Sequence, residues 1–360
     1  MSTQHMIPLW SAGALTVLWL CLLFKVSRNK VAARGYKGFW LAMLSWPMLL
    51  SSELWQLVGG ASPWVAAAAV VAMPLLLAGI YRNLLAMLWR KPNLVLWPFY
   101  AAGIGLLVLV AIQGWLNGSD WQQWPGFAPI GEPLSYWAVY LSCLIAAFLF
   151  LYISIVLIEQ LQQYHHELPL QVVDTEMYHI KGLSGASGFA VGMAFCLAII
   201  VAAVAFGFLP LTFWLAWFHL GLALTTLVLL AQLSRAHRPS PSPFDHDAMS
   251  EAPKMSQSTA QALLKRAEAA VISQKAYKEI GLTLAVFAER AGISASDICL
   301  ALLAGKKTHF RGFIYQYRMK YAKQVLLGSD TKLGSVTKRL KLGANGTASR
   351  SFLKYLESRR

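Results

Sequence analysis

The feature that most constrains this chain is a series of long apolar stretches in its first 233 residues. A helix that crosses a bilayer needs about 20 mostly apolar residues, and its backbone groups must be satisfied inside the helix. Stretches of this kind run over residues 7–24, 39–57, 64–81, 94–113, 134–158, 183–209 and 211–233. The sequence therefore predicts an all-α fold that begins with a seven-helix transmembrane bundle over residues 1–233.

Lysine and arginine in the connections between these stretches predict the orientation, because positive loops stay on the cytoplasmic side. The N-terminal tail and the second, fourth and sixth connections contain none. The first, third and fifth connections contain Lys25, Arg28, Lys30, Arg34, Lys37, Arg82, Arg90, Lys91 and Lys181. We therefore expect the N-terminus outside and the C-terminal part in the cytoplasm.

Charge separates the C-terminal part from the rest of the chain. Residues 1–234 contain 9 basic and 7 acidic residues, whereas residues 235–360 contain 22 basic and 9 acidic residues. Such a concentration of positive charge favours an anionic partner, either nucleic acid or anionic lipid. Residues 234–258 are rich in proline and serine and predict a flexible linker, followed by a soluble domain over residues 259–360.

Four residues of the membrane part are candidates for sensing a ligand. Ionisable side chains within membrane helices are costly, and Glu53 and His219 stand out because both fall in outer halves of predicted helices. They either line an outward-facing pocket or reach the interface and a neighbouring helix, and the second interpretation is favoured. Trp121 and Trp124 lie in the outer connection 114–133, which forms either an interfacial aromatic belt or a lid over a ligand.

Neither enzymatic chemistry nor a cofactor is expected. The sequence contains no phosphate-binding loop, dinucleotide-binding fingerprint, serine-hydrolase elbow or zinc-protease motif. His165, His166, Glu167 and His179 gather in the fifth connection, but their spacing matches no metal template and favours a solvated polar loop. Ser184, Gly188 and Gly192 form a stripe of small residues that predicts close packing between helices, with packing inside one chain favoured over a dimer seam.

Helical periodicity returns in the C-terminal part, with soluble amphipathic character. Helices are predicted over residues 260–277 and 284–291, followed by a turn at 292–294 and a helix that begins at Ser294. A long helix over 310–326 carries an apolar stripe, with Arg318 among the basic residues on its surface. A short helix at 333–340 and a last helix from Asn345 complete two helix-turn-helix patterns joined by a long helix.

This order resembles the DNA-binding domain of AraC-type regulators over about residues 260–360. The matching residues include Leu282, Leu284, Ala288, Gly292, Ile293, Phe310, Phe313, Arg318, Ala322 and Leu326, with the family's spacing from Phe313 to Arg318 and Ala322. A membrane bundle joined to such a domain resembles a subgroup of bacterial membrane-bound AraC-type regulators. The resemblance implies a multi-pass protein of the bacterial inner membrane.

The resemblance also implies which residues meet DNA. The first recognition helix offers Ser296 beside Ala295, Cys299 and Leu300, which read bases poorly. Base readout is therefore expected from the second recognition helix, at Asn345, Thr347, Ser349 and Arg350. Phosphate contacts are expected from Lys306, Lys307, His309, Arg311, Lys338 and Arg339.

These patterns predict a one-component transcriptional regulator integrated in the membrane. Its expected partners are double-stranded DNA, the lipid bilayer, a second copy of the chain in a homodimer, and an unidentified small-molecule or membrane signal. The alternative is a membrane transporter or membrane enzyme whose basic tail binds anionic lipid or a partner protein. Broken membrane helices would favour that alternative.

Overall fold

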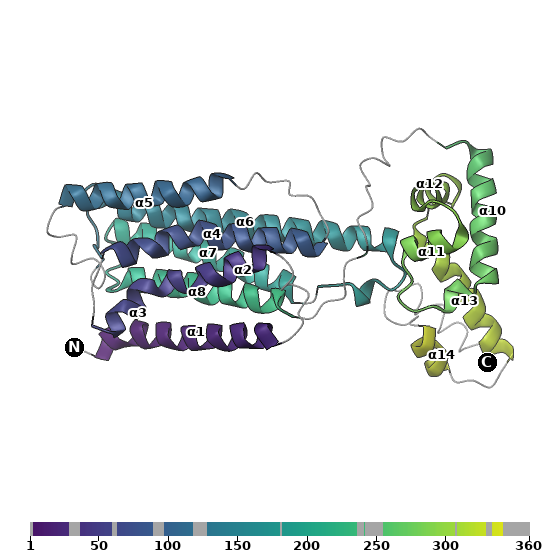
Figure 1. The fold of residues 1–360 in the computed structure, drawn as a ribbon, viewed down its shortest axis with the longest axis horizontal. Helices are drawn as coiled ribbons and strands as arrows, with labels where there is room; N and C mark the ends of the chain where they lie inside the picture. The colour runs from purple at the N-terminus through teal and green to yellow at the C-terminus, as the bar shows by residue number, and fades with distance from the viewer. Residues whose placement is uncertain are drawn as a thin grey trace. The chain divides into compact units, whose positions relative to one another are not determined.

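The computed structural model describes residues 3–28, 37–59, 63–88, 97–117, 128–180, 182–235, 241, 255–306, 308–328 and 333–340. Within these ranges the chain is helical without strands, as the sequence predicts, and extended backbone pairs only in an isolated bridge between Val172 and Thr283. The chain divides into two compact units (Figure 1). The first comprises Met1–Gln162 and Ile180–His237, and the second Gln163–His179 and Arg238–Arg360.

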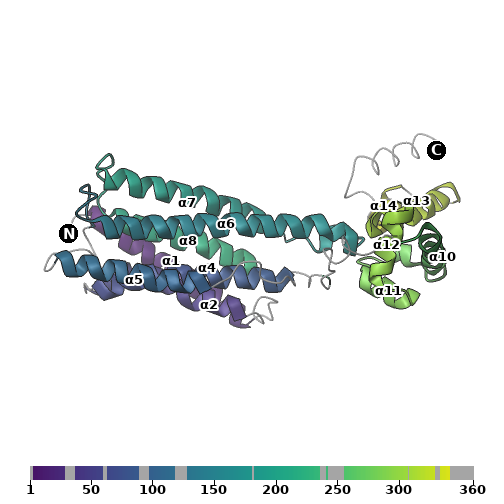
Figure 2. The same cartoon turned by 90° about the horizontal axis from the view of Figure 1, so that it is seen from above.

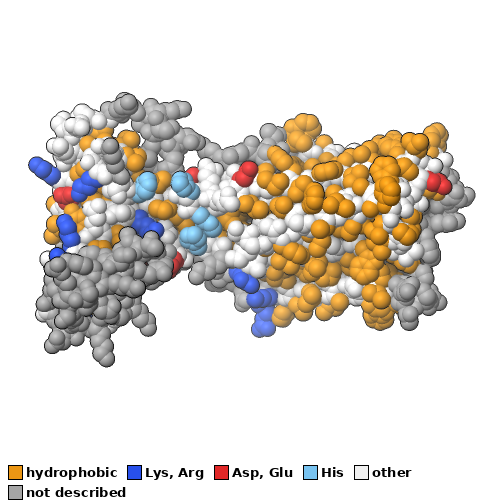
Figure 3. Space-filling model, turned by 180° about the vertical axis from the view of Figure 1, so that it is seen from behind, with side chains coloured by type: hydrophobic (Ala, Val, Ile, Leu, Met, Phe, Trp, Pro, Cys, Tyr) orange, Lys and Arg blue, Asp and Glu red, His pale blue; other side chains and the backbone are white. Residues whose placement is uncertain are grey.

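The first unit is built from apolar helices that run alongside one another (Figures 1 and 2). They are α1 Thr3–Arg28, α2 Lys37–Ser45, η2 Trp46–Leu50, α3 Ser51–Leu57, α4 Pro63–Leu88, α5 Trp97–Asn117, α6 Trp137–Gln171, α7 Leu183–Ala205 and α8 Trp214–Leu233. Five segments among the described residues are long and apolar enough to cross a membrane: Met6–Arg28, Val71–Leu88, Trp137–Gln171, Leu183–Ala205 and Trp214–Leu233. On the face seen in Figure 3, hydrophobic side chains gather over this unit.

One of the predicted membrane segments differs from expectation. The stretch 39–57 is not one helix, because a 3-10 turn at Trp46–Leu50 separates α2 from α3. Pro47 lies at the start of that turn and has no N–H to continue the α-helical hydrogen bonds.

Helix α6 is much longer than a bilayer crossing requires. Its 35 residues correspond to about 52 Å at 1.5 Å per residue, against a hydrocarbon core of about 30 Å. The predicted membrane segment ends at residue 158, but the helix continues to Gln171. His165, His166 and Glu167 therefore lie on this helix rather than in a loop, and the part of the helix from Gln163 to Gln171 belongs to the second unit.

Helices α2 and α4 cross with their backbones almost in contact. A methyl group added at Gly79 would lie 2.7 Å from the Ala42 amide nitrogen and 2.8 Å from the Gly38 carbonyl oxygen. One added at Gly38 would lie 2.6 Å from both the Asn83 amide nitrogen and the Gly79 carbonyl oxygen. Glycine is required at both positions because any side chain would collide with backbone.

The stripe of small residues on α7 does not make the predicted packing. Ser184, Gly188 and Gly192 are exposed, and no atom lies within 4 Å of a methyl group built at either glycine. The buried side of α7 is formed instead by residues such as Ala190, Ala194 and Val201. The prediction of intramolecular packing through this stripe is therefore wrong.

The close crossing gives a direct test of the first unit. Gly79→Ala should lower the stability of the membrane unit by about 1–3 kcal/mol, because the added methyl group must push two backbones apart. Gly105→Ala on α5 is the matched control, since a methyl group there meets nothing within 4 Å. Thermal unfolding of the purified variants in detergent measures the difference, and equal stability of the two variants would contradict the crossing.

The second unit packs its described helices around a compact core. They are α10 Gln257–Ser273, η5 Ala276–Lys278, α11 Leu284–Ala291, α12 Ala295–Lys306, α13 Phe310–Gly328 and α14 Leu333–Leu340. Phe287, Phe310 and Phe313 are fully buried, and Ile293 and Ile298 lie in the same cluster. A smaller cluster joins α13 to α14 through Ala322, Leu326, Val336 and Leu340. The apolar stripe predicted on the helix 310–326 contributes Phe310, Phe313 and Leu326 to these clusters, whereas Phe287 was not predicted.

Caps define the turn between α11 and α12. Thr283 Oγ1 accepts a hydrogen bond from Val286 N at 3.3 Å, and Gly292 ends α11 in the left-handed conformation with φ of 63°. Ser294 Oγ then accepts from Asp297 N at 3.0 Å, which is the predicted cap of the next helix. A glycine turn between two capped helices fixes the angle at which α12 leaves the core.

Candidate functional site

Glu53 and His219 form a buried pair in the first unit. Glu53 comes from α3 and His219 from α8, and the distance from Glu53 Oε1 to His219 Nδ1 is 2.9 Å. Both residues are buried, with 2% and 4% of their surface exposed. Among the described residues, Glu53 Oε2 has no hydrogen-bond partner. The favoured interpretation is therefore wrong for Glu53, which is buried rather than at the interface, and right for His219, which hydrogen-bonds a neighbouring helix.

The interrupted helix places this pair. Trp46, at the start of η2, donates its indole N–H to the Ala223 carbonyl oxygen on α8 at 3.0 Å and stacks on Trp19 at 6.0 Å. Ala223 follows His219 by one helical turn. Since Trp46 anchors η2 to α8, the helix that resumes at Ser51 brings Glu53 to His219.

The two candidate tryptophans of the outer connection, Trp121 and Trp124, lie outside the described residues. The described end of that connection is firmly held. Trp214 Nε1 and Tyr140 Oη both donate to the Pro129 carbonyl oxygen at 2.8 Å, and their rings stack at 5.6 Å. Residues 129–131 are therefore fixed to the N-terminal ends of α6 and α8.

In the second unit, α12 is the helix that the sequence resemblance predicts as a first recognition helix. Ser296 is exposed near its N-terminus, while Cys299 is buried and takes no part in the exposed surface. Burial raises the pKa of the Cys299 thiol to about 12, so it stays protonated at neutral pH. The exposed part of α12 otherwise presents Leu303, Ala304 and Gly305, which offer few hydrogen bonds to a base edge.

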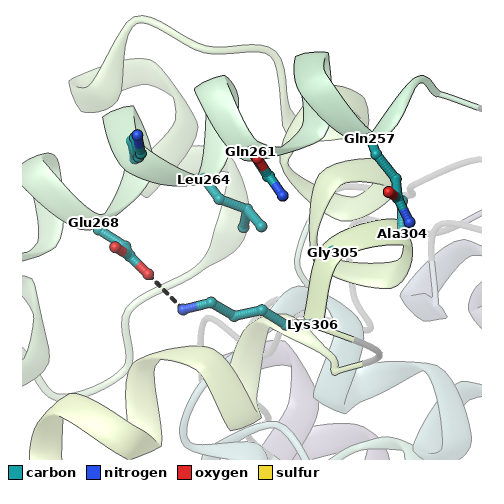
Figure 4. A pocket seen from close by; sticks show the side chains of 8 residues that line it. Gln257, Gln261, Leu264, Glu268, Ala304, Gly305 and Lys306 are labelled. Carbon is teal, nitrogen blue, oxygen red and sulfur yellow. Dashed lines mark hydrogen bonds and ion pairs between the residues drawn. The ribbon is translucent and has the colours of Figure 1, made fainter.

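Lys306 closes one end of a cleft between α10 and α12. The cleft has a volume of about 300 Å³ and is lined by Gln257, Gln261, Leu264, Lys265, Glu268, Ala304, Gly305 and Lys306 (Figure 4). The Lys306 ammonium pairs with the Glu268 carboxylate across the cleft and lies 5.2 Å from the centre of the Phe313 ring. A lysine with an acidic partner has part of its charge already neutralised.

The remaining predicted DNA contacts are placed only in part. His309 and Arg339 are exposed, and Arg311 is half-buried with its guanidinium 5.8 Å from the Tyr315 ring centre. Ser296 and Lys306 lie at opposite ends of α12, about 15 Å apart along the helix. The other predicted contacts fall outside the described residues or have undescribed side chains: Lys307, Lys338, Asn345, Thr347, Ser349 and Arg350.

The connection between α6 and α7 is not the solvated loop expected from its composition. Asp174 and Thr175 are buried, with 7% and 5% of their surface exposed. The rings of His165 and His179 stack at 4.2 Å. Among the described residues, no three histidine, cysteine, aspartate or glutamate side chains are placed to hold a metal ion. The sequence did not reveal that this segment is buried, because the residues that it contacts, such as Leu282, lie more than 100 residues further along the chain.

Comparison with known proteins adds no relative. No family model matches the chain, and neither a curated protein nor a solved structure matches it.

Proposed function

We propose that the chain is a one-component transcriptional regulator integrated in a bacterial inner membrane. Its C-terminal unit is proposed to be cytoplasmic and to bind promoter DNA as a homodimer. The signal acts on the membrane unit, proposed to cross the bilayer seven times with the N-terminus outside. No catalytic step and no cofactor are part of this proposal.

The observation that carries the proposal is the capped α11–turn–α12 pair packed against the long helix α13. A helix, a short glycine turn and a second helix is the arrangement that DNA-binding domains insert into the major groove. The excess of basic over acidic residues beyond residue 234 supplies a positive field that attracts a phosphate backbone. The resemblance to AraC-type domains supports a second recognition helix over residues 345–360.

Arg350→Ala tests the proposed base readout. Arginine paired with guanine contributes about 1–3 kcal/mol of discrimination, so specific binding should weaken by that amount while non-specific binding changes little. Fluorescence anisotropy with a specific and a scrambled duplex separates the two effects. Lys354→Ala, a charge removed from the same C-terminal stretch, should weaken both duplexes equally. An Arg350→Ala protein that keeps its full preference for the specific duplex would remove Arg350 from the site.

A second pair of variants tests the proposed phosphate contact of Lys306. Lys306→Met should lower DNA affinity and reduce the salt slope by about one, because one ionic contact is lost. Glu268→Gln should have the opposite effect and raise affinity roughly two- to fivefold at low salt, because Lys306 loses its competing carboxylate. Titrations at several salt concentrations measure both, and effects of the same sign in both variants would contradict the contact.

A transporter with a basic regulatory tail is the second candidate, and one observation favours it. The second apolar segment is interrupted at Trp46–Leu50, and a buried acidic side chain, Glu53, follows the interruption. Broken helices beside buried ionisable groups are typical of substrate sites in transporters. The two candidates are distinguished by offering the full-length protein duplex DNA and vesicles containing phosphatidylserine. The regulator should prefer DNA, and a transporter tail should prefer the vesicles.

A further inference from the structure

Part of the connection between α6 and α7 is built into the core of the second unit. Val173 is 1% exposed and belongs to the same cluster as Phe287 and Phe313. Its amide nitrogen donates to the Leu282 carbonyl oxygen at 3.1 Å, next to the antiparallel bridge between Val172 and Thr283. A segment that precedes α7 in sequence is therefore as buried in this unit as the unit's own core residues.

Asp174 completes the anchor by pairing with Arg318 of α13. Arg318 Nη1 donates to Asp174 Oδ1 at 2.7 Å, and Nη2 donates to Oδ2 at 3.0 Å. Arg318 is only 1% exposed, so the expectation that it decorates the helix surface is wrong. Asp174 Oδ2 also accepts from Gly281 N at 2.6 Å. Two-pronged pairs between arginine and carboxylate are both strong and geometrically specific.

The other donors of the guanidinium are also satisfied, but only by neutral groups. Arg318 Nε donates to the Tyr277 carbonyl oxygen at 2.9 Å, and Nη2 donates to the Glu279 carbonyl oxygen at 2.7 Å. Asp174 is therefore the carboxylate that neutralises this buried cation. A further hydrogen bond holds the same connection: Tyr178 Oη donates to the Gly281 carbonyl oxygen at 3.4 Å.

The segment that carries Val173 and Asp174 connects two apolar helices of the first unit. α6 ends at Gln171, directly before the bridge, and α7 begins at Leu183. Both helices are long and apolar enough to cross a membrane. Because α6 runs directly into the bridge at Val172, a displacement of α6 would act on the segment that carries Val173 and Asp174, and α7 follows that segment in sequence.

We infer that residues 172–174 are a docking segment through which two membrane helices hold the C-terminal unit, by which we mean residues 238–360 of the second unit. The ion pair between Asp174 and Arg318 is the main contact of this docking segment. The C-terminal unit is then joined to the membrane part twice, once through the chain near residue 240 and once through this non-covalent dock. The inference does not depend on what the C-terminal unit binds. If the proposed function is right, the dock is the route by which the signal reaches DNA.

Cutting the chain after the membrane part tests the inference. A protease site replaces residues 243–249, and the full-length protein is cleaved in nanodiscs of phosphatidylcholine at high salt, which removes attraction of the basic fragment to lipid. The C-terminal fragment of the otherwise native protein should remain with the nanodisc in gel filtration. Asp174→Asn should weaken its retention roughly tenfold or more, because the buried cation loses its counter-charge. Glu176→Gln is the control, since Glu176 is exposed on the same segment.

Two outcomes would overturn the inference. In the first, the fragment of the otherwise native protein leaves the nanodisc as completely as the Asp174→Asn fragment. In the second, the nanodisc retains both fragments equally. Neither outcome concerns DNA, so failure of the dock is distinguishable from failure of the proposed function.

A cysteine pair gives a measurement that does not depend on folding of the Asp174 variant. Val172→Cys with Thr283→Cys should form a disulfide in the uncut protein, because residues paired across an antiparallel bridge lie about 4.5–5.5 Å apart at Cα. After cleavage, the two fragments should migrate as one band until reduced. Each single-cysteine variant is the control, and absence of the joined band under mild oxidation would contradict the dock.

Discussion

Asp174→Ala is expected to lower the free energy of unfolding of the C-terminal unit by about 3–5 kcal/mol. Removing one partner of a buried ion pair leaves the other charge in a medium that solvates it poorly. Arg318 is 1% exposed, and without Asp174 it keeps only backbone carbonyl groups as acceptors. The loss would be a large part of the 5–15 kcal/mol that stabilises a typical domain.

Hydrogen exchange of the full-length protein in nanodiscs measures this effect, followed at amides of α11 and α13. Glu176→Ala on the same segment should change stability by no more than about 0.5 kcal/mol, since its side chain is exposed. Asp174→Leu combined with Arg318→Met should recover much of the loss, because an apolar pair of similar volume needs no counter-charge. Unchanged protection in Asp174→Ala would show that the carboxylate does not stabilise the unit.

Glu53→Leu is expected to destabilise the membrane unit by about 1–3 kcal/mol, because it leaves a buried hydrogen-bonding side chain, His219, without its partner. The substitution removes the hydrogen-bonding partner that lies 2.9 Å from His219 Nδ1 and leaves that ring buried. Glu53→Gln should cost less, because the amide still offers an oxygen to His219. Thermal unfolding in detergent ranks the variants.

A double-mutant cycle isolates the interaction between the two side chains. Glu53→Leu with His219→Leu should cost clearly less than the sum of the single substitutions, because the second change removes the group that the first left unpaired. Glu132→Gln is the control, since Glu132 is an exposed acid near the predicted outer side. Additive costs would mean that the two side chains do not depend on each other.

Local sequence signals predicted much of the fold. The helix expected over 284–291 is α11, because Thr283 and Gly292 carry the start and stop signals within the segment itself. The interruption at Trp46–Leu50 was also signalled, by Pro47, but the high apolar content of 39–57 favoured one continuous helix. Periodicity alone does not show where a proline turn is tolerated by a neighbouring helix.

Tertiary relations could not be predicted from local patterns. The α7 stripe at Ser184, Gly188 and Gly192 has the right spacing for close packing but is exposed, whereas Gly38 and Gly79, 41 positions apart, make the close crossing. Likewise, Arg318 looked like one more surface cation of a basic helix. Its burial depends on Asp174, 144 residues earlier, and no helical or strand periodicity connects two such positions.

The most direct test of the central claim is a selection from random duplex DNA by the full-length protein in phosphatidylcholine nanodiscs, read at two salt concentrations. The account predicts enrichment of a defined motif, with affinity that falls steeply as salt rises because each phosphate contact releases counterions. A pool that remains random after repeated rounds, with binding that depends on salt alone, would contradict a sequence-specific regulator.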